Sequence, residues 1–320
     1  MATLKKLLIT PVFVLFLFSS CSKTETEFPE NPKQSMQEFV IQISQYAKKN
    51  KSNFIVIPQN GIELAFTKYN SSSELNLEFT NAINGFGIEA LFYDGHELPI
   101  YDRLTMLQKF SERKRVLVSD YVSDNSLIGD AINKNRNEGF LCFPRLNFNY
   151  DYTHIPGRIS KENKNDILTL KEAQNYLYLI NSSKYNTKQE LLDNIATTNF
   201  DVILIDLFFH EQPLTKEDLR KIKKKQNGGK RLVISYMNIG SAEKYRYYFN
   251  NNWSINNPHW LVKPYKGYEN EIFVKYWSKE WRSIIYGNDN SYIKKIIDAG
   301  FDGAYLDNVK AYNYLFSDEF

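Results

Sequence analysis

Cysteine and histidine are scarce in this sequence, and their scarcity excludes several kinds of site. The 320 residues contain two cysteines, Cys21 and Cys142. Two thiols exclude a disulfide framework and a zinc site built from cysteine. The four histidines, at positions 96, 154, 210 and 259, show no HxH or HxxxH spacing, which disfavours a zinc hydrolase. We therefore expect no metal ion and no other cofactor.

A strong excess of charge of either sign is also absent. The formal net charge is +3, and removing the first twenty residues, with Lys5, Lys6 and no acid, leaves 3 − 2 = +1. This balance gives no reason to expect nucleic acid or another polyanion as a partner. Hydrophobic residues make up 42% of the chain, enough for a sizeable core, and aromatic residues 15%. Aromatic enrichment suits surfaces that stack on sugars, but it is equally a property of cores.

The first twenty residues have the composition of a targeting segment. Two lysines precede an apolar run over 7–18, and this run is too short for a transmembrane helix. Phe18-Ser-Ser-Cys21 resembles a bacterial lipobox, which implies cleavage before Cys21 and lipidation of its sulfur. We expect a lipid-anchored protein of the bacterial cell envelope, with ordinary secretion as the alternative. Residues 21–34 are polar with two prolines, typical of a flexible tether, and 35–320 is expected to be one domain.

Strand and helix patterns alternate along the remainder of the chain. Ser35-Met-Gln-Glu38 is a capping-box signature that predicts a helix start. Nine strand candidates lie at 53–58, 85–93, 114–121, 140–146, 175–180, 200–209, 231–238, 272–277 and 304–306. Alternation with helices predicts an α/β fold with a parallel sheet, and eight strands close a TIM (β/α)8 barrel. We take 140–146 as the surplus strand because no clear helix follows it. A doubly wound open sheet is the alternative, although no strand is followed by a GxGxxG or P-loop turn.

Five acids lie at or near the ends of these predicted strands: Glu89, Asp120, Asp206, Glu243 and Asp307. Acids that converge at the carboxyl edge of a parallel barrel are typical of catalysis. Two of them also have a structural alternative, because Asp307 can cap a helix and Glu89 can be solvated on an exposed face. Glycoside hydrolysis requires two carboxyl groups, one to protonate the leaving oxygen and one to act as nucleophile or base. The spacing in the sequence does not select the pair.

Several segments resemble the endo-α-1,4-polygalactosaminidase family, glycoside hydrolase family 114 and its relatives. They are RLVISYMNIGSAEKYR at 231–246, the aromatic block at 253–281, GFDGAYLDN at 300–308, PQNG at 58–61, IEALF at 88–92 and VLVSDY at 116–121. The resemblance covers most of residues 53–310. It implies a TIM barrel, secreted by bacteria, that hydrolyses galactosamine-containing polysaccharide.

The resemblance also implies roles for individual residues. The LDN acid corresponds to Asp307 and the IEALF acid to Glu89, which makes them the catalytic carboxylates. The implied substrate-binding positions are Asp206, Tyr236, Glu243, Arg246, Gln59, Asn60 and Asp120. Trp277 is a further candidate, for stacking on a sugar ring, with core packing as the favoured alternative. Arg246 is suited to holding a carboxylate ionised, and acidic groups suit an amino sugar, which is cationic when it is not acetylated.

The segments differ from the family in order and in one acid. In the family the strand similar to 175–180 comes first, and PQNG, IEALF and VLVSDY follow the LDN strand, whereas here they precede it. This order implies a circular permutation near residues 150–170, in which the last strand, with Asp307, pairs with the first. Relatives often have Gly-Glu-Ala-Glu where this chain has Gly-Ser-Ala-Glu, so Ser241 removes an acid. A non-catalytic carbohydrate-binding lipoprotein on a degenerate barrel is the alternative function, and an interaction protein is a third.

Overall fold

The computed structural model describes residues 28–99, 102–149 and 151–316. The lipobox, Cys21 and the first half of the predicted tether, residues 21–27, lie outside these residues. The first helix, α1, begins at Pro32 and ends at Asn50, so it starts inside the predicted tether and before Ser35. Asn31 explains the early start, because its side chain accepts a hydrogen bond from the backbone N–H of Gln34 at 3.1 Å, and Pro32 suits the first helical position.

Parallel strands form the centre of the molecule. Five of them pair in the order β1–β14–β10–β7–β6, and β2, β3, β4 and β5 form a second parallel sheet in which β4 and β5 both pair with β3. Their bounds are β1 Ile55–Pro58, β2 Gly85–Glu97, β3 Arg115–Val122, β4 Leu141–Cys142, β5 Arg145–Leu146, β6 Tyr176–Leu179, β7 Val202–Asp206, β10 Leu232–Asn238 and β14 Gly303–Asp307. The protein is therefore an α/β protein with parallel sheets.

The last strand pairs with the first, as the sequence predicts. In the parallel register of β1 and β14, Ile55 lies opposite Gly303 and Pro58 opposite Leu306. A parallel bridge between Gln59 and Gly87 then connects the end of β1 to β2. In the described part of the chain, no ladder joins β6 to β4 or β5, so the two ends of this series of strands are not hydrogen-bonded to each other.

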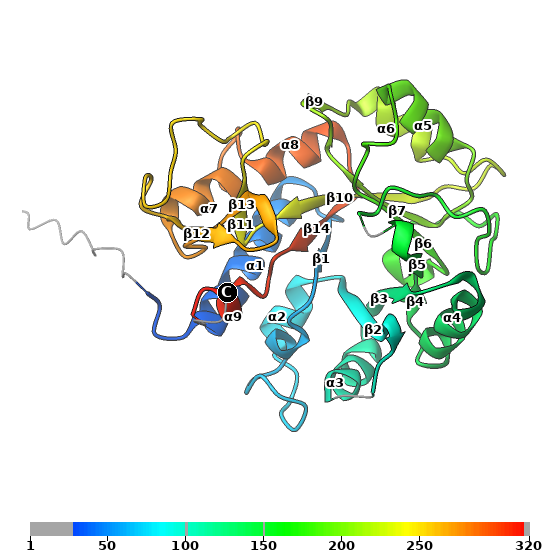
Figure 1. Cartoon of the computed structure of the whole chain (residues 1–320), viewed down its shortest axis with the longest axis horizontal. Helices are drawn as coiled ribbons and strands as arrows, with labels where there is room; N and C mark the ends of the chain where they lie inside the picture. Colours follow the sequence, from blue (N-terminus) through cyan, green and yellow to red (C-terminus); the bar gives the residue numbers. More distant parts are fainter. Residues whose placement is uncertain (1–27, 100–101, 150, 317–320) are drawn as a thin grey trace, which may run out of the picture.

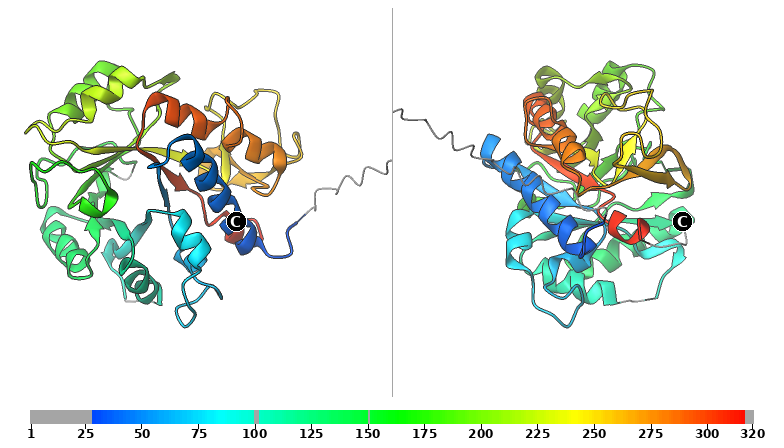
Figure 2. Two further views of the ribbon diagram at one scale, coloured as in Figure 1. Left: turned by 180° about the vertical axis from the view of Figure 1, so that it is seen from behind. Right: turned by 90° about the vertical axis from the view of Figure 1, so that its left-hand side faces the viewer.

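Helices lie around the outside of the strands, as both views in Figure 2 show. Their bounds are α2 Leu77–Ala82, α3 Asp102–Ser111, α4 Ile128–Asn137, α5 Lys188–Ala196, α6 Lys216–Ile222, α7 Lys279–Ile285, α8 Tyr292–Ala299 and α9 Ala311–Tyr314. Thr187 caps the start of α5, because its side-chain oxygen accepts from the N–H of Glu190 at 3.1 Å. Helix α8 ends at Gly300, whose φ of 99° is left-handed and favours glycine. Within the described residues, no helix is long and apolar enough to cross a membrane.

The surplus strand is not the one that the sequence indicated. Residues 140–146 contribute β4 and β5 to the parallel sheet, interrupted at Pro144, which has no N–H to donate. The predicted strand 272–277 instead belongs to β13 (Tyr268–Val274), which pairs antiparallel with β11 (Ser241–Glu243) and β12 (Leu261–Tyr265). This small antiparallel sheet lies beside the carboxyl end of β10 (Figure 1).

The predicted strand 200–209 was too long. Strand β7 ends at Asp206, and β8 (Phe208–Phe209) pairs antiparallel with β9 (Gln212–Pro213) in a separate hairpin. The break follows from Asp206, whose Oδ1 accepts from the N–H of Phe208 at 2.8 Å and so turns the chain two residues on. The turn leaves the Asp206 side chain at the edge of the sheet.

Candidate functional site

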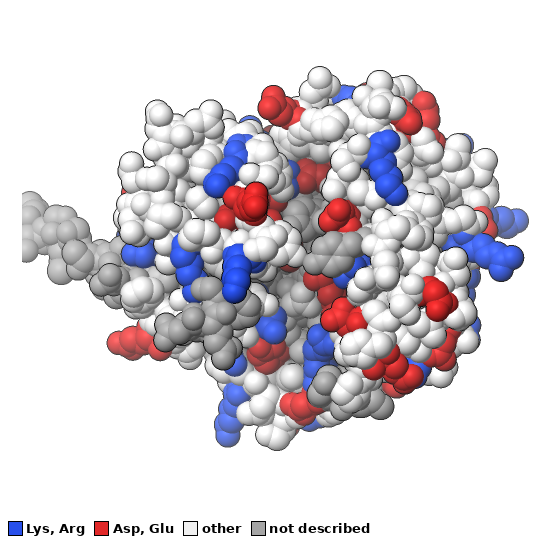
Figure 3. Space-filling view, viewed as in Figure 1, with Lys and Arg blue, Asp and Glu red and all other residues white. Residues whose placement is uncertain are grey.

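A cavity of about 680 Å³ opens at the carboxyl edge of the parallel strands. Asp206 and Asp307 are the last residues of β7 and β14, Gln59 and Asn60 follow β1, and all four line the cavity. In the space-filling view, acidic side chains gather around the hollowed middle of this face (Figure 3). The volume and position are those of a small-molecule or substrate site in an α/β protein.

Asp307 is held in this cavity by two donors. The hydroxyl of Tyr236 donates to Oδ2 at 2.7 Å, and the backbone N–H of Asn308 donates to Oδ1 at 2.7 Å. Burial raises the pKa of Asp307 to about 7, with the negative charge of Glu89 as the next cause, while the hydrogen bond from Tyr236 lowers it. Near neutral pH this carboxyl group therefore exists in both protonation states.

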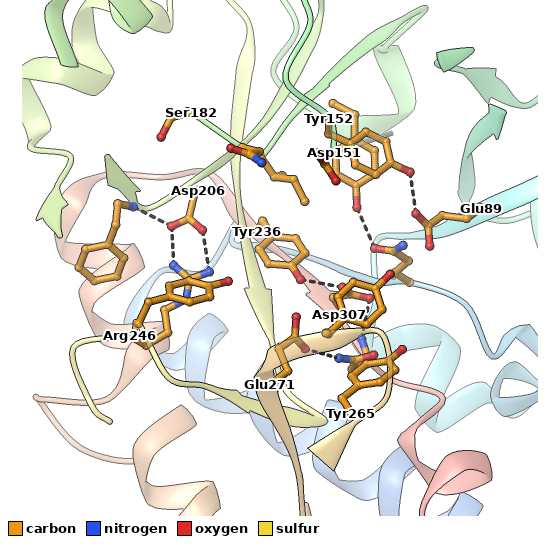
Figure 4. A pocket seen from close by; sticks show the side chains of 18 of the residues that line it. Glu89, Asp151, Tyr152, Ser182, Asp206, Tyr236, Arg246, Tyr265, Glu271 and Asp307 are labelled. Carbon is orange, nitrogen blue, oxygen red and sulfur yellow. Dashed lines mark hydrogen bonds and ion pairs between the residues drawn. The ribbon is translucent and has the colours of Figure 1, made fainter. Parts of the chain in front are cut away.

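Glu89 faces the same cavity from β2 (Figure 4). Its Oε1 accepts from the Tyr152 hydroxyl at 2.6 Å, and its Oε2 accepts from Asn60 Nδ2 at 3.2 Å. Asn60 also accepts, through Oδ1, from the backbone N–H of Glu89 at 3.2 Å. Two neutral donors thus satisfy the carboxylate and fix its rotamer, so that Glu89 is oriented towards the cavity without a cationic partner among these contacts.

Asp120 fixes the backbone behind Glu89 and does not line the cavity. After Glu89, β2 loses its regular register with β3 until Asp94. Asp120 Oδ1 accepts from the N–H groups that follow, those of Leu91 at 2.8 Å, Phe92 at 2.9 Å and Tyr93 at 3.3 Å. Burial raises the pKa of Asp120 and these hydrogen bonds lower it. The sequence predicted this acid at a strand end with a role in substrate binding. Its side chain instead binds the irregular part of β2 and does not face the cavity.

Unusual backbone conformations concentrate around the two carboxyl groups. Asn60, Tyr152, His210 and Asn308 line the cavity and have φ of 60°, 55°, 53° and 56°. Ala90, which directly follows Glu89, has a φ of 49°. Left-handed conformations are costly for alanine and tyrosine, and such strain is characteristic of functional sites.

A buried ion cluster forms another part of the wall. Arg246 donates to both carboxylate oxygens of Asp206, at 2.8 and 2.7 Å, and to Glu243 Oε2 at 2.6 Å. The carboxylates of Asp206 and Glu243 raise the pKa of Arg246 well above its usual range, against the effect of burial. Arg246 therefore pairs with two supporting acids and does not contact Asp307 or Glu89 through these bonds (Figure 4). Asp206 lines the cavity, whereas Glu243 lies behind Arg246.

Glu271 is a cavity residue that the sequence reasoning missed. It lies on β13, before the start of the predicted strand, and it occupies the region of Ser241, where an acid seemed to be missing. Its Oε2 accepts from Ser241 Oγ at 2.6 Å, from Asn238 Nδ2 at 2.9 Å and from Asn308 Nδ2 at 3.3 Å. Burial and the charge of Glu243 raise the pKa of Glu271 to about 7. The antiparallel sheet thus brings a carboxyl group to the position beside Ser241.

The structure brings most of the predicted site residues together. Those that line the cavity are Glu89, Asp307, Asp206, Tyr236, Arg246, Gln59 and Asn60. Trp277 does not line it, because its ring packs against Tyr276 at 5.0 Å and Phe316 at 6.1 Å between centroids. Tyr152 and Asp151 do line it, although they fall in a stretch without a periodic pattern. Among the described residues, no group of His, Cys, Asp or Glu is arranged to hold a metal ion.

The fold and site define an α/β protein with an acidic cavity at the carboxyl ends of parallel strands. Comparison with known families extends this description. The sequence profile of glycoside-hydrolase family GH114 matches residues 160–319, half of the chain. The chain belongs to this family. The matched segment contains Asp206, Tyr236, Arg246, Glu271 and Asp307, whereas Glu89 lies outside it.

Relatives from other organisms are similar over shorter segments. An uncharacterized protein of Methanocaldococcus jannaschii is 35% identical over 173 residues, which is 53% of this chain and 48% of the relative. An uncharacterized protein of Thermotoga maritima is 33% identical over 120 residues, covering 38% of this chain and 36% of its own length. One of Deinococcus radiodurans is 28% identical over 124 residues, 39% of this chain and 38% of that protein. The matches therefore span half or less of these relatives.

Proposed function

We propose that this protein is a glycoside hydrolase that cleaves α-1,4-linked, galactosamine-containing polysaccharide with the carboxyl groups of Asp307 and Glu89. The observation that carries the proposal is the pairing of these groups in one cavity, where the charge of Glu89 helps to raise the pKa of Asp307 to about 7. Membership of family GH114 supports the reaction class.

The pair has the electrostatics that glycoside hydrolysis requires. Two carboxyl groups that repel each other in a buried site hold one proton between them near neutral pH. One group then protonates the glycosidic oxygen as the bond to the anomeric carbon breaks, and the other is the nucleophile or activates water. Tyr236 and Tyr152 each donate to one member of the pair, which orients both groups before the substrate enters.

The acidic lining favours an amino sugar as substrate. Acidic side chains of Glu89, Asp151, Asp206, Glu271 and Asp307 line the cavity. Three cationic residues, Arg145, Arg246 and Lys310, line it too, and Arg246 is paired with Asp206 and Glu243. The lining acids therefore exceed the cations by five to three. An ammonium group on the sugar would complement this lining, since oppositely charged groups attract strongly in a partly buried site.

We propose in addition that the parallel strands form a (β/α)8 barrel with a permuted strand order, anchored to the cell envelope through Cys21. Side chains support closure between the ends of the strand series, because Tyr152 stacks on Tyr178 of β6 at 3.9 Å between ring centroids. Phe143, between β4 and β5, contacts Tyr176 of β6 at 5.8 Å. The pairing of β1 with β14 supports the permutation, because the first and last strands of the chain are neighbours in the sheet. The chain can therefore begin at a different strand while each strand keeps its neighbours. The anchor rests on the lipobox resemblance.

The experiment is to incubate the purified chain with α-1,4-linked oligogalactosamine, its N-acetylated form and chitosan as a β-linked control. Mass spectrometry and a reducing-end assay measure cleavage. We expect new reducing ends and shorter oligomers from the α-linked substrates alone. Binding of these oligomers without cleavage would favour the alternative, a carbohydrate-binding lipoprotein. Absence of both binding and cleavage would exclude both functions for these sugars.

A further inference from the structure

A second cavity adjoins the first. It has a volume of about 400 Å³ and shares Phe208, His210, Tyr245 and Arg246 with the wall of the larger cavity. Residues that line only the second cavity are Glu211, Lys244, Tyr247, Phe249 and Asn251. Since one set of side chains borders both cavities, the two lie close enough for a single oligosaccharide to reach both.

Tyr245 stands at the junction with a fixed orientation. Its hydroxyl donates to Glu243 Oε1 at 2.5 Å, and the Arg246 guanidinium carbon lies 5.0 Å from the ring centroid. Tyr245 is nevertheless 57% exposed, so the ring face away from Arg246 meets solvent. Its side chain is therefore ordered before any ligand arrives, which lowers the entropic cost of binding.

Tyr247 adds a second exposed aromatic side chain to this cavity. It is 42% exposed, and its ring packs near Phe208, with 5.7 Å between centroids. The Lys295 ammonium nitrogen lies 4.8 Å from the Tyr247 centroid. Two exposed aromatic rings in the lining of one cavity gather apolar area at one place, and such gathered apolar area marks interaction sites. Rings with a polar rim match the apolar faces and hydroxyl edges of sugars.

We propose that this second cavity is a further sugar subsite, with Tyr245 as its stacking platform, that binds the continuation of the polysaccharide cleaved between Asp307 and Glu89. The inference rests on the proposed function. The occupant is the same chain as the substrate, since the two cavities adjoin and share the side chains of Tyr245 and Arg246 in their walls. The subsite gives the protein a preference for long chains and positions the scissile bond.

The test measures binding separately from cleavage. In an Asp307→Asn background, which retains the shape of the site, isothermal titration calorimetry gives the affinity for α-1,4-linked oligogalactosamines of increasing length. We expect affinity to increase with length, and Tyr245→Ala to abolish most of that increase. The expected loss for the longest oligomers is about tenfold, equivalent to about 1.4 kcal/mol. Tyr245→Phe keeps the ring and is expected to retain most of the length dependence.

The control is Phe148→Ala, which removes a ring that is 58% exposed and lines neither cavity. It should leave affinities at every length unchanged. A length dependence that survives Tyr245→Ala, or that Phe148→Ala reduces equally, would overturn the subsite and leave the proposed function intact. Lack of binding of any length by the Asp307→Asn protein, together with lack of cleavage by the wild type, would instead refute the proposed function.

Discussion

Replacing Tyr236 with phenylalanine should raise the pKa of Asp307 and displace one limb of the pH–rate profile. The Tyr236 hydroxyl donates to Asp307 Oδ2 at 2.7 Å, and this bond stabilises the ionised form. A hydrogen bond to a charged group contributes about 1.5–3 kcal/mol, and each pKa unit corresponds to about 1.4 kcal/mol. Without the bond, the pKa of Asp307 should therefore rise from about 7 by about one to two units.

The assay is kcat/KM for oligogalactosamine cleavage between pH 4 and 10. If Asp307 acts in its protonated form, the basic limb of Tyr236→Phe moves to higher pH by about one to two units. If Asp307 acts as the carboxylate, the acidic limb moves in the same direction. The limb that moves thus identifies its role. Tyr276→Phe is the control, because its buried hydroxyl donates to the Pro32 carbonyl at 2.9 Å, away from the site. A profile in which neither limb moves would refute the reasoning.

Further predictions concern stability and the anchor. The folded pKa of Asp307 is raised, so the stability it contributes is complete below pH ~4 and is lost as the pH rises through about 7. Asp307→Asn should therefore stabilise the chain at pH 8 by up to about 4 kcal/mol but change little at pH 4, and urea unfolding with equal effects at both pH values would contradict this. Arg246→Met removes the cation that pairs with the buried Glu243 and the partly buried Asp206 and should cost about 3–5 kcal/mol. The exposed Arg220→Met should cost less than about 1 kcal/mol, and similar losses in the two variants would contradict the buried cluster. Cys21→Ser should abolish incorporation of radiolabelled palmitate in a bacterial host, and labelling of that variant would exclude the predicted anchor.

The parallel part of the fold was predictable because its signals are local. Continuous apolar runs mark strands buried on both faces, so β1, β10 and β14 stand out, and Gly300 marks the end of α8. Strand 272–277 was misplaced because an apolar run does not reveal whether its partner is parallel. The position of β13 depends on β11 and β12, which are distant in sequence. Helix α1 begins earlier than predicted because Asn31 caps it. The predicted cap, Ser35, lies inside the helix.

The candidate site was predictable where its residue is the last residue of a parallel strand. Asp206 and Asp307 are such residues, and both line the cavity. Glu271 and Tyr152 could not be found in this way, since their positions depend on an antiparallel sheet and on an irregular segment. Asp120 has the same sequence signal as Asp307, yet it binds backbone N–H groups of β2. Only the tertiary structure distinguishes an acid that faces a cavity from one that satisfies the backbone.

The most direct test of the catalytic pair compares kcat/KM for oligogalactosamine cleavage by the wild type, Asp307→Asn and Glu89→Gln. Asp298→Asn is the matched control, because Asp298 is an exposed acid that pairs with Lys294 on α8. We predict that each of the first two variants loses at least about a hundredfold while folding normally, and that Asp298→Asn keeps wild-type activity. Wild-type activity in either Asp307→Asn or Glu89→Gln would contradict the assignment of the pair.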